Sequence, residues 1–460
     1  MRKTLVILVA GLTPELVGKS TPNLEQLAGR GGLRPLKTVL PAVTCTVQST
    51  LLTGLPPSGH GAVANGWYFR ELCEPLFWRQ PEHFVAGEKI WETGRKRDPR
   101  FTCAKMFWWY NMYTSADWSA TPRPIYRADG VKLSDHYAHP AELRDELNDK
   151  FGMFPLFRFW GPLADIVSSR WITQATLHVM ETRDPTLTLC YLPHLDYNLQ
   201  RLGPHLSSLR LRQDLSEVDA LCGELIEFAD RSGREIIVVS EYGITPVDSA
   251  VHINRALREA GLLQVRRELG GELLDAGASH AFALADHQVA HVYIKPLTPL
   301  AEVRDLILDL DGVGSVLDEA GKRALGLDHP RSGELVAIAR PNRWFSYYYW
   351  LDDARAPDFA PTVEIHRKPG FDPMELFIDP KIKAPKLAVA WRLTKRKLGF
   401  RSLLDVIPIT GTHLVKGSHG RLTEDPRQGP LVIASRRDLL PEGSVRAQGF
   451  KTLVLDHIFA

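Results

Sequence analysis

Four short runs of apolar, β-prone residues constrain the fold of this chain most strongly. They are LVILV, TCAKMFWWY, LTLCYLP and EIIVVS, at residues 5–9, 102–110, 187–193 and 235–240. Residues 216–233, between the last two runs, carry apolar side chains near three- and four-residue spacing, which is typical of an amphipathic helix. Apolar strands that alternate with helices predict an α/β, doubly wound fold whose mostly parallel sheet is covered on both faces.

Four positions at strand ends indicate where a site would form in such a fold. Ligands of open α/β sheets bind beyond the carboxyl ends of the strands. The sequence places Ala10, Thr44, Asp196 and Glu241 at or just past such ends. We therefore expect these positions to converge, and this expectation rests on the fold alone.

Residues 41–68, PAVTCTVQSTLLTGLPPSGHGAVANGWY, contain the clearest candidate for chemistry. A strand-like run at residues 38–43 passes into a helix-like run at residues 48–54, and Thr44 lies at the joint. A hydroxyl there would stand at a helix N-terminus, where unpaired N–H groups and the helix dipole favour an anion. From these residues alone, a nucleophile and a simple helix cap are both open interpretations of Thr44.

The composition excludes several classes of protein. A formal net charge of +2 in 460 residues argues against a nucleic-acid binder that relies on bulk charge. The five cysteines are scattered and lack a CxxC pair, which favours a reducing compartment. The N-terminal apolar run lacks a cleavage site, and no run approaches the ~20 apolar residues of a spanning helix. We expect a cytoplasmic protein without a membrane partner.

The chain divides into three parts by its sequence pattern. Residues 1–245 form the expected core, and their aromatic segment at residues 70–135 is either packed interior or a loop region that covers a substrate. Residues 246–345 contain strand- and helix-like runs typical of a small α+β module. Residues 346–460 are expected to return to the core. Helical residues 386–400 are basic on one side, which we interpret as a solvated face.

The motifs around Thr44 are similar to those of a known family. TPNLEQLA at residues 21–28, TLLTGLPPSGHG at residues 50–61 and NGWY at residues 65–68 resemble the type I phosphodiesterase/nucleotide pyrophosphatase branch of the alkaline phosphatase superfamily. The resemblance implies an alkaline-phosphatase-like core with the α+β module inserted as a cap. It also implies that Thr44 attacks phosphorus and that Asn65 holds a phosphoryl oxygen.

The chain departs from the ligand pattern with which this family binds two zinc ions. Asp196 and His419 match ligand positions, and Glu241 replaces a shorter aspartate. Alanine cannot bind a metal, glutamine offers a neutral amide oxygen, and a phenol is a poor ligand unless it ionises, with a reference pKa near ~10. These three residue types occupy the remaining ligand positions, at Ala10, Gln200 and Tyr242.

The resemblance therefore implies one divalent ion, zinc or else magnesium or manganese, and makes a two-zinc site doubtful. Its expected ligands are Asp196, Glu241, His419 and, more weakly, Gln200. The spare groups that could rebuild a site are His194, His205, His252, Asp286 and His287. The residues expected to contact substrate are Trp67, Trp109, Tyr110 and Tyr242.

Two functions remain open at this point. The first is metal-assisted hydrolysis or transfer at a phosphate ester or phosphodiester of a small organic substrate, with Thr44 as nucleophile. The second is a pseudoenzyme that keeps the anion pocket of Thr44 and Asn65 as a ligand-binding site. The lost ligands are the argument for the second, because they would have stabilised charge in the transition state. We nevertheless expect the enzyme, a hydrolase of the phosphodiesterase/phosphatase type.

Overall fold

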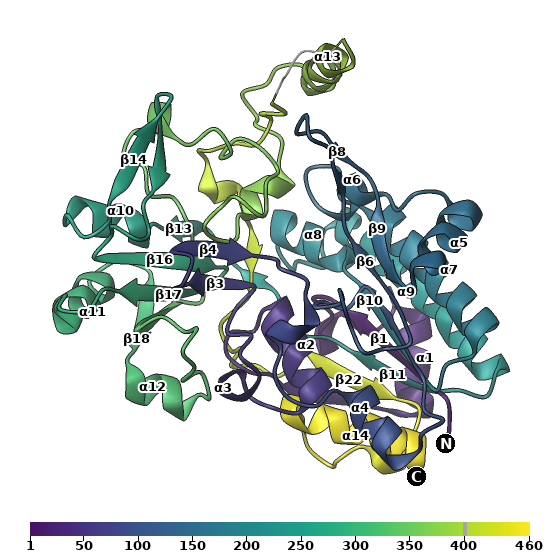
Figure 1. Ribbon diagram of the computed structural model, residues 1–460. Helices are drawn as coiled ribbons and strands as arrows, with labels where there is room; N and C mark the ends of the chain where they lie inside the picture. The colour runs from purple at the N-terminus through teal and green to yellow at the C-terminus, as the bar shows by residue number, and fades with distance from the viewer. Residues whose placement is uncertain (399–402) are drawn as a thin grey trace.

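A large, mostly parallel sheet runs through the wider part of the molecule (Figure 1). The computed structural model describes residues 1–398 and 403–460, and within them this sheet has nine strands. In spatial order they are β23 (Val445–Arg446), β2 (Gly32–Lys37), β22 (Leu431–Ala434), β11 (Glu235–Val239), β1 (Thr4–Val9), β10 (Leu187–Leu192), β5 (Cys103–Met106), β6 (Trp118–Pro122) and β9 (His136–His139).

The centre of the sheet is its most apolar part. β1 pairs in parallel with β10 on one side and with β11 on the other. Every residue of β1 and β10 is buried, as expected for strands covered on both faces. β22 and β9 run antiparallel to their neighbours. The predicted α/β fold and mostly parallel sheet are confirmed, with antiparallel strands that the apolar runs did not indicate.

Helices form a layer on each face of the sheet (Figure 1). One layer contains α1 (Pro22–Arg30), α5 (Ala141–Phe151), α6 (Leu156–Phe159), α7 (Ile166–Arg183), α8 (His194–Leu202) and α9 (Leu209–Arg231). The other contains α2 (Thr44–Thr53), α3 (Pro57–His60), α4 (Ile90–Arg97) and α14 (Phe450–Phe459). The helix predicted at residues 216–233 is α9, which begins earlier because the Ser208 side chain accepts a hydrogen bond from the amide of Leu211.

A smaller module lies beside the core (Figure 1). Its four-stranded antiparallel sheet has the order β16 (Ala281–Asp286), β17 (Val289–Ile294), β19 (Leu335–Ala339) and β18 (Val313–Leu317). Helices α10 (Ile253–Glu259), α11 (Leu300–Leu308) and α12 (Glu319–Ala324) accompany it. The strands and helix predicted within residues 289–339 are present. β16 was not predicted, because its sequence AFALAD lacks β-branched residues.

The remaining elements lie outside these two sheets. They are β3 (Gly66–Phe69), β4 (Glu74–Phe77), β7 (Ile125–Tyr126), β8 (Lys132–Leu133), β12 (Thr245–Pro246), β13 (Ser249–Val251), β14 (Val265–Glu268), β15 (Gly271–Leu274), β20 (Arg343–Phe345), β21 (Gly417–Ser418) and α13 (Pro385–Lys397). Tyr347, Met374 and Val415 pack in the hydrophobic cluster of the module, and the chain rejoins the large sheet at β22. The division of the chain at residues 245 and 345 stays a prediction.

The expectation of a strand at residues 38–43 is wrong. β2 ends at Lys37, and the residues before α2 are irregular, with a single bridge between Ala42 and Gly420. The β-prone composition of TVLPAV imitates a strand, but Pro41 has no N–H to give to a ladder. The entry to α2 is therefore held by the C-terminal segment that carries His419.

Among the helices of residues 1–398 and 403–460, none combines the length and the apolar composition needed to cross a bilayer.

The stability of the core is expected to depend on Asp219 of α9. This buried carboxylate accepts hydrogen bonds from the amides of Asn23 and Leu24 at the start of α1, at 3.0 Å each. Asp219→Ala should lower the free energy of unfolding in urea by about 2–4 kcal/mol, because buried amide donors lose a charged partner.

The matched control is Asp230→Ala on the same helix. Asp230 pairs with Arg30 at 2.8 Å, but both side chains are 42% exposed, so the loss should be about 0–1 kcal/mol. Equal losses in the two variants would contradict this account of how α1 is held.

Candidate functional site

The predicted strand-end positions meet at the N-terminus of α2. The Thr44 hydroxyl donates to Glu241 Oε1 at 3.2 Å and lies 3.5 Å from the Tyr242 hydroxyl. The Tyr242 hydroxyl donates to Asp196 Oδ1 at 3.2 Å. Ala10 is fully buried at the end of β1 and offers no ligand atom. Four of the predicted residues thus form one hydrogen-bonded group from three separate segments of the chain.

Thr44 is the first residue of α2, and its side chain does not cap the helix. Val43 occupies the cap position in an extended conformation, and α2 has no side-chain cap hydrogen bond. The Thr44 hydroxyl is directed to Glu241 instead. Of the two open interpretations of Thr44, the simple cap is therefore wrong. A helix N-terminus of this kind keeps partial positive charge available for an anion.

Glu241 is held by the same helix that carries Thr44. Gln48 Nε2, one turn after Thr44, donates to Glu241 Oε2 at 3.0 Å, and Gln48 Oε1 accepts the amide of Trp109 at 2.6 Å. Burial raises the pKa of Glu241 to about 8, against the lowering effect of the bonds from Gln48 and Thr44. Gln48 was missed by the sequence analysis. Its signal was the four-residue spacing from Thr44, which puts both side chains on one helix face.

Asn65 is positioned by a carboxylate from the smaller module. Its backbone N and Nδ2 donate to Asp286 at 2.7 and 3.0 Å, and its Oδ1 accepts the amide of Cys45 at 2.9 Å. Asp286 ends β16, and burial raises its pKa to about 7. The amide nitrogen of Asn65 carries two hydrogens, so one remains for a ligand oxygen. Asp286 was only a spare group in the sequence, because no local pattern shows its contact with Asn65.

The residues around Asp196 fit one metal ion. His419 Nδ1 donates to the carbonyl of Ala42 at 2.8 Å, so its Nε2 keeps a lone pair, 3.8 Å from Asp196 Oδ1. The two do not form an ion pair, because burial lowers the pKa of His419 to about 3. Gln200 Nε2 donates to Asp196 Oδ2 at 2.6 Å, while its buried Oε1 has no hydrogen-bond partner. A divalent cation would satisfy the imidazole nitrogen, the carboxylate and the orphaned amide oxygen together.

The other family ligand positions do not fit a second ion. Ala10 has no donor atom, and burial raises the pKa of Tyr242 well above its ordinary value, so the phenol stays neutral. The Tyr242 ring stacks on His419 with centroids 3.5 Å apart and planes 4° apart. Its hydroxyl lies between Thr44 and Asp196 and contacts both. Only Glu241 keeps a charged ligand group at this position.

Six aromatic rings form a connected row that begins at Tyr242, whose hydroxyl is next to Thr44. In order, its members are Tyr242, His419, His287, Phe371, Trp78 and Trp109, with successive centroids 3.5, 3.6, 3.7, 6.2 and 5.1 Å apart. Burial lowers the pKa of His287 well below its ordinary value, so this ring too is neutral. The two imidazoles therefore bring no positive charge to this row.

The remaining aromatic predictions have mixed outcomes. Trp67 and Tyr110 are buried in one hydrophobic cluster with Cys45, the residue that follows Thr44 in α2. Their contact with substrate stays a prediction. Phe107 and Trp108, from the same aromatic segment, pack in the main core instead. The segment at residues 70–135 is thus partly core. Its Trp78 and Trp109 belong to the row of rings that begins at Tyr242.

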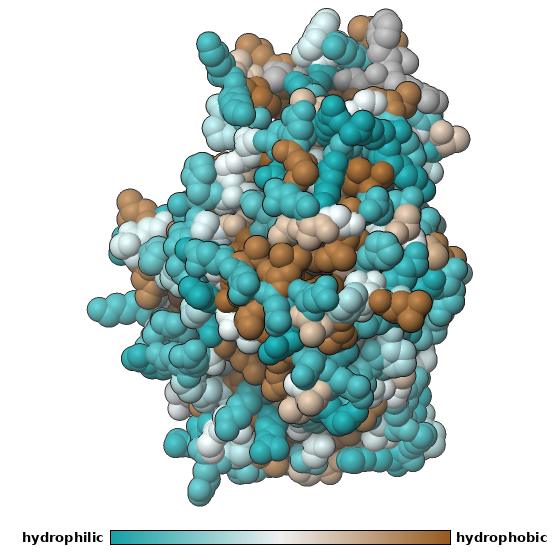
Figure 2. Space-filling view, turned by 90° about the vertical axis from the view of Figure 1, so that its left-hand side faces the viewer, coloured by the Kyte–Doolittle hydropathy of each residue, from teal (hydrophilic) through white to brown (hydrophobic). Residues whose placement is uncertain are grey.

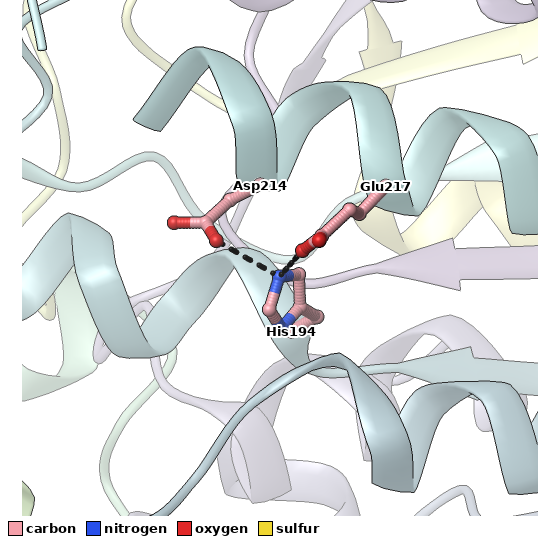
Figure 3. Close-up of side chains that lie close together, drawn as sticks. All are labelled: His194, Asp214 and Glu217. Atoms are coloured by element: carbon pink, nitrogen blue, oxygen red, sulfur yellow. Dashed lines mark hydrogen bonds and ion pairs between the residues drawn. The ribbon is translucent and has the colours of Figure 1, made fainter. Parts of the chain in front are cut away.

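A second acidic cluster lies between α8 and α9 (Figure 3). His194 Nε2 is 3.2 Å from Asp214 Oδ1 and 3.6 Å from Glu217 Oε2, a grouping that could hold a metal ion. However, Asp214 also pairs with Arg210 at 2.9 Å and accepts Asn198 Nδ2 at 2.6 Å, so its charge is already compensated. We interpret this cluster as a structural contact between the start of α8 and α9.

The comparisons with known proteins show the family of this chain. A model of the family described as type I phosphodiesterase / nucleotide pyrophosphatase matches residues 4–372. The chain belongs to this family. Its match runs from β1 to the residues just past Phe371, and includes both Thr44 and the module that carries Asp286.

Relatives of this phosphodiesterase-family chain are distant. An uncharacterized pyrophosphatase/phosphodiesterase of Schizosaccharomyces pombe is 27% identical over 242 residues, which are 49% of this chain but only 41% of that protein. A phosphonoacetate hydrolase from Sinorhizobium meliloti, in complex with phosphonoformate, has 16% identity and a TM-score of 0.62, with 99% of this chain and 96% of that chain covered. Mouse ectonucleotide pyrophosphatase / phosphodiesterase 5 in complex with AMP has 15% identity and a TM-score of 0.61, with 100% and 95% covered. These two structures show the fold.

We expect at most one tightly bound divalent ion per chain, because the donor set of Asp196, Gln200 and His419 fits one and the charge of the cluster in Figure 3 is already compensated. Elemental analysis of the purified protein should find this ion and should find it lost in Asp196→Ala and in His419→Ala. His194→Ala, in the cluster of Figure 3, is the matched control and should keep the metal. Two ions per chain, or loss of metal in His194→Ala alone, would show that the site is assigned wrongly.

Proposed function

We propose that this chain hydrolyses, or transfers a phosphoryl group from, a phosphate ester or phosphodiester of a small organic molecule, with Thr44 as nucleophile. The observation that carries the proposal is the hydrogen bond from the Thr44 hydroxyl to the buried Glu241 carboxylate at a helix N-terminus without a side-chain cap. AMP and phosphonoformate, the ligands of the two structural relatives, are small phosphorus oxyanions and support this class of substrate.

Glu241 takes the role of general base in this proposal. An alcohol is a weak nucleophile, and a base within hydrogen-bond reach activates it by accepting its proton. Glu241 Oε1 is 3.2 Å from the Thr44 hydroxyl, and the bond from Gln48 fixes the carboxylate in that position. The Thr44 oxygen then forms a bond to phosphorus as the leaving oxygen departs, and water later cleaves the phosphothreonine.

Three groups stabilise the phosphoryl oxygens. The free hydrogen of the Asn65 amide donates to one oxygen, and Asp286 keeps that amide in place. The N-terminus of α2 contributes its partial positive charge. A divalent ion bound by Asp196, Gln200 and His419 would supply a full positive charge for the developing negative charge.

The pseudoenzyme remains the second candidate function. The observation that favours it is the position of the Tyr242 hydroxyl, which contacts Thr44 and Asp196 where the family binds its second ion. In this case the chain would bind a phosphorus oxyanion at the N-terminus of α2 without turning it over. An activity assay separates the two functions. Substitution of Thr44 would abolish the turnover of an enzyme, whereas a pseudoenzyme has no turnover to lose.

Thr44→Ala should abolish hydrolysis of p-nitrophenyl phosphate or bis-p-nitrophenyl phosphate, whichever the wild-type protein cleaves. The free energy of unfolding should fall by only about 1–2 kcal/mol, because one buried hydrogen bond is lost and no helix cap. Thr46→Ala is the matched control on the same helix, since the Thr46 hydroxyl is buried and has no hydrogen-bond partner. Turnover retained in Thr44→Ala would rule out Thr44 as nucleophile, and no turnover in the wild-type protein on either substrate would favour the pseudoenzyme.

Glu241→Gln should lower kcat by about 10²–10⁴-fold, the usual contribution of a general base. KM and the metal content should stay unchanged, because the amide keeps the size of the side chain and Glu241 is not among the fitted ligands. Steady-state kinetics and elemental analysis of the same preparation check both points. Loss of the metal together with activity would instead assign Glu241 as a ligand, as the family resemblance implied.

A further inference from the structure

Helix α13 (Pro385–Lys397) stands clear of the rest of the molecule (Figure 1). Residues 381–398 contain seven lysines and arginines and no acidic residue. The function proposed above assigns no role to this segment. A positive surface of this kind is complementary to an anionic partner.

The outward face of α13 is apolar as well. Leu387, Trp391 and Leu398 are 73%, 59% and 67% exposed. Leu387 and Trp391, four residues apart, lie on one face of the helix, and Leu398 directly follows the last helical residue, Lys397. Thr394 lies in the same register, and its hydroxyl donates to the carbonyl of Ala390 at 2.8 Å, so its polar group is satisfied within the helix. In Figure 2, hydrophobic surface is visible at the top of the molecule.

The opposite face of α13 attaches the helix to the protein. Val389 packs against the hydrophobic cluster of the module, as do Ile382 and Leu404 on either side of the helix. Most surface helices bury their single apolar stripe against the core and present polar residues to water. Among the described side chains of α13, Val389 makes an apolar contact with the protein, whereas Leu387 and Trp391 form an exposed apolar stripe. Lys395 borders that stripe, with its Nζ 5.3 Å from the centroid of the Trp391 ring.

We propose that α13 docks on the surface of an anionic phospholipid bilayer. Leu387, Trp391 and Leu398 would enter the boundary between head groups and acyl chains, a depth that amphipathic helices and tryptophan both favour. Lysines and arginines of the helix would contact anionic head groups. A nucleic acid would match the charge but would leave the two leucines in water, whereas a bilayer accounts for both features. This partner differs from the sequence-based expectation of no membrane, and it does not depend on the proposed function.

Sedimentation of the full-length protein with lipid vesicles tests the proposal. Vesicles of phosphatidylcholine and phosphatidylglycerol in equal parts should bind the protein at low salt, and less as the salt concentration rises. Vesicles of phosphatidylcholine alone should not. Trp391→Ala and Lys395→Glu should each weaken binding by about tenfold or more. The matched controls are Leu297→Ala, at a fully exposed leucine of the module, and Lys19→Glu, at an exposed lysine of the core, and both should bind like the wild-type protein.

Three results would overturn the proposal. The first is no binding to the anionic vesicles, or equal binding to both kinds of vesicle. The second is a loss of binding in the α13 variants that is no larger than in the controls. The third is a dimer in sedimentation velocity without vesicles that Trp391→Ala dissociates, because a second copy of the chain would then cover the stripe.

Discussion

The burial of three carboxyl groups near one another is the constraint on which the site depends. Asp196, Glu241 and Asp286 are all withdrawn from water, and burial raises the pKa of each to between about 6 and 8. A buried charge is tolerated only when hydrogen bonds or an opposite charge compensate it. Each carboxyl group here accepts hydrogen bonds from side chains of other segments, so the core, α2 and the module are joined through these contacts.

The same constraint explains how the site differs from a paired metal site. Neutral residues, Ala10 and Tyr242, occupy two of the positions that would hold a second cation. Glu241 occupies the third, where its carboxyl group accepts hydrogen bonds from Thr44 and Gln48, the arrangement that the proposed general base needs. Asp196 lies near the imidazole of His419 and accepts a hydrogen bond from Gln200, whose amide oxygen has no hydrogen-bond partner. A cation would fit this half of the site.

Sequence reasoning found those parts of the site that local patterns encode. The apolar strands and the rule that ligands lie past their carboxyl ends brought Asp196 and Glu241 together correctly, whereas Thr44 joins them from the start of α2 and not from the end of a strand. Gln48 and Asp286 were missed because their roles are contacts between segments far apart in the chain. The strand expected at residues 38–43 failed because β-prone residues also occur in irregular segments that a proline keeps out of a sheet. The exposed stripe of α13 could not be seen from the sequence, since only packing shows which face of a helix is covered.

The most direct test is a crystal structure of the protein with orthovanadate, which imitates phosphorus bonded to five oxygens, with anomalous data to identify metals. The account predicts vanadium bonded to the Thr44 oxygen and within reach of the Asn65 amide. It also predicts a single ion at Asp196 and His419, with the Tyr242 hydroxyl still in the second position. Vanadate bound away from Thr44, or two ions with Tyr242 displaced from the site, would contradict it.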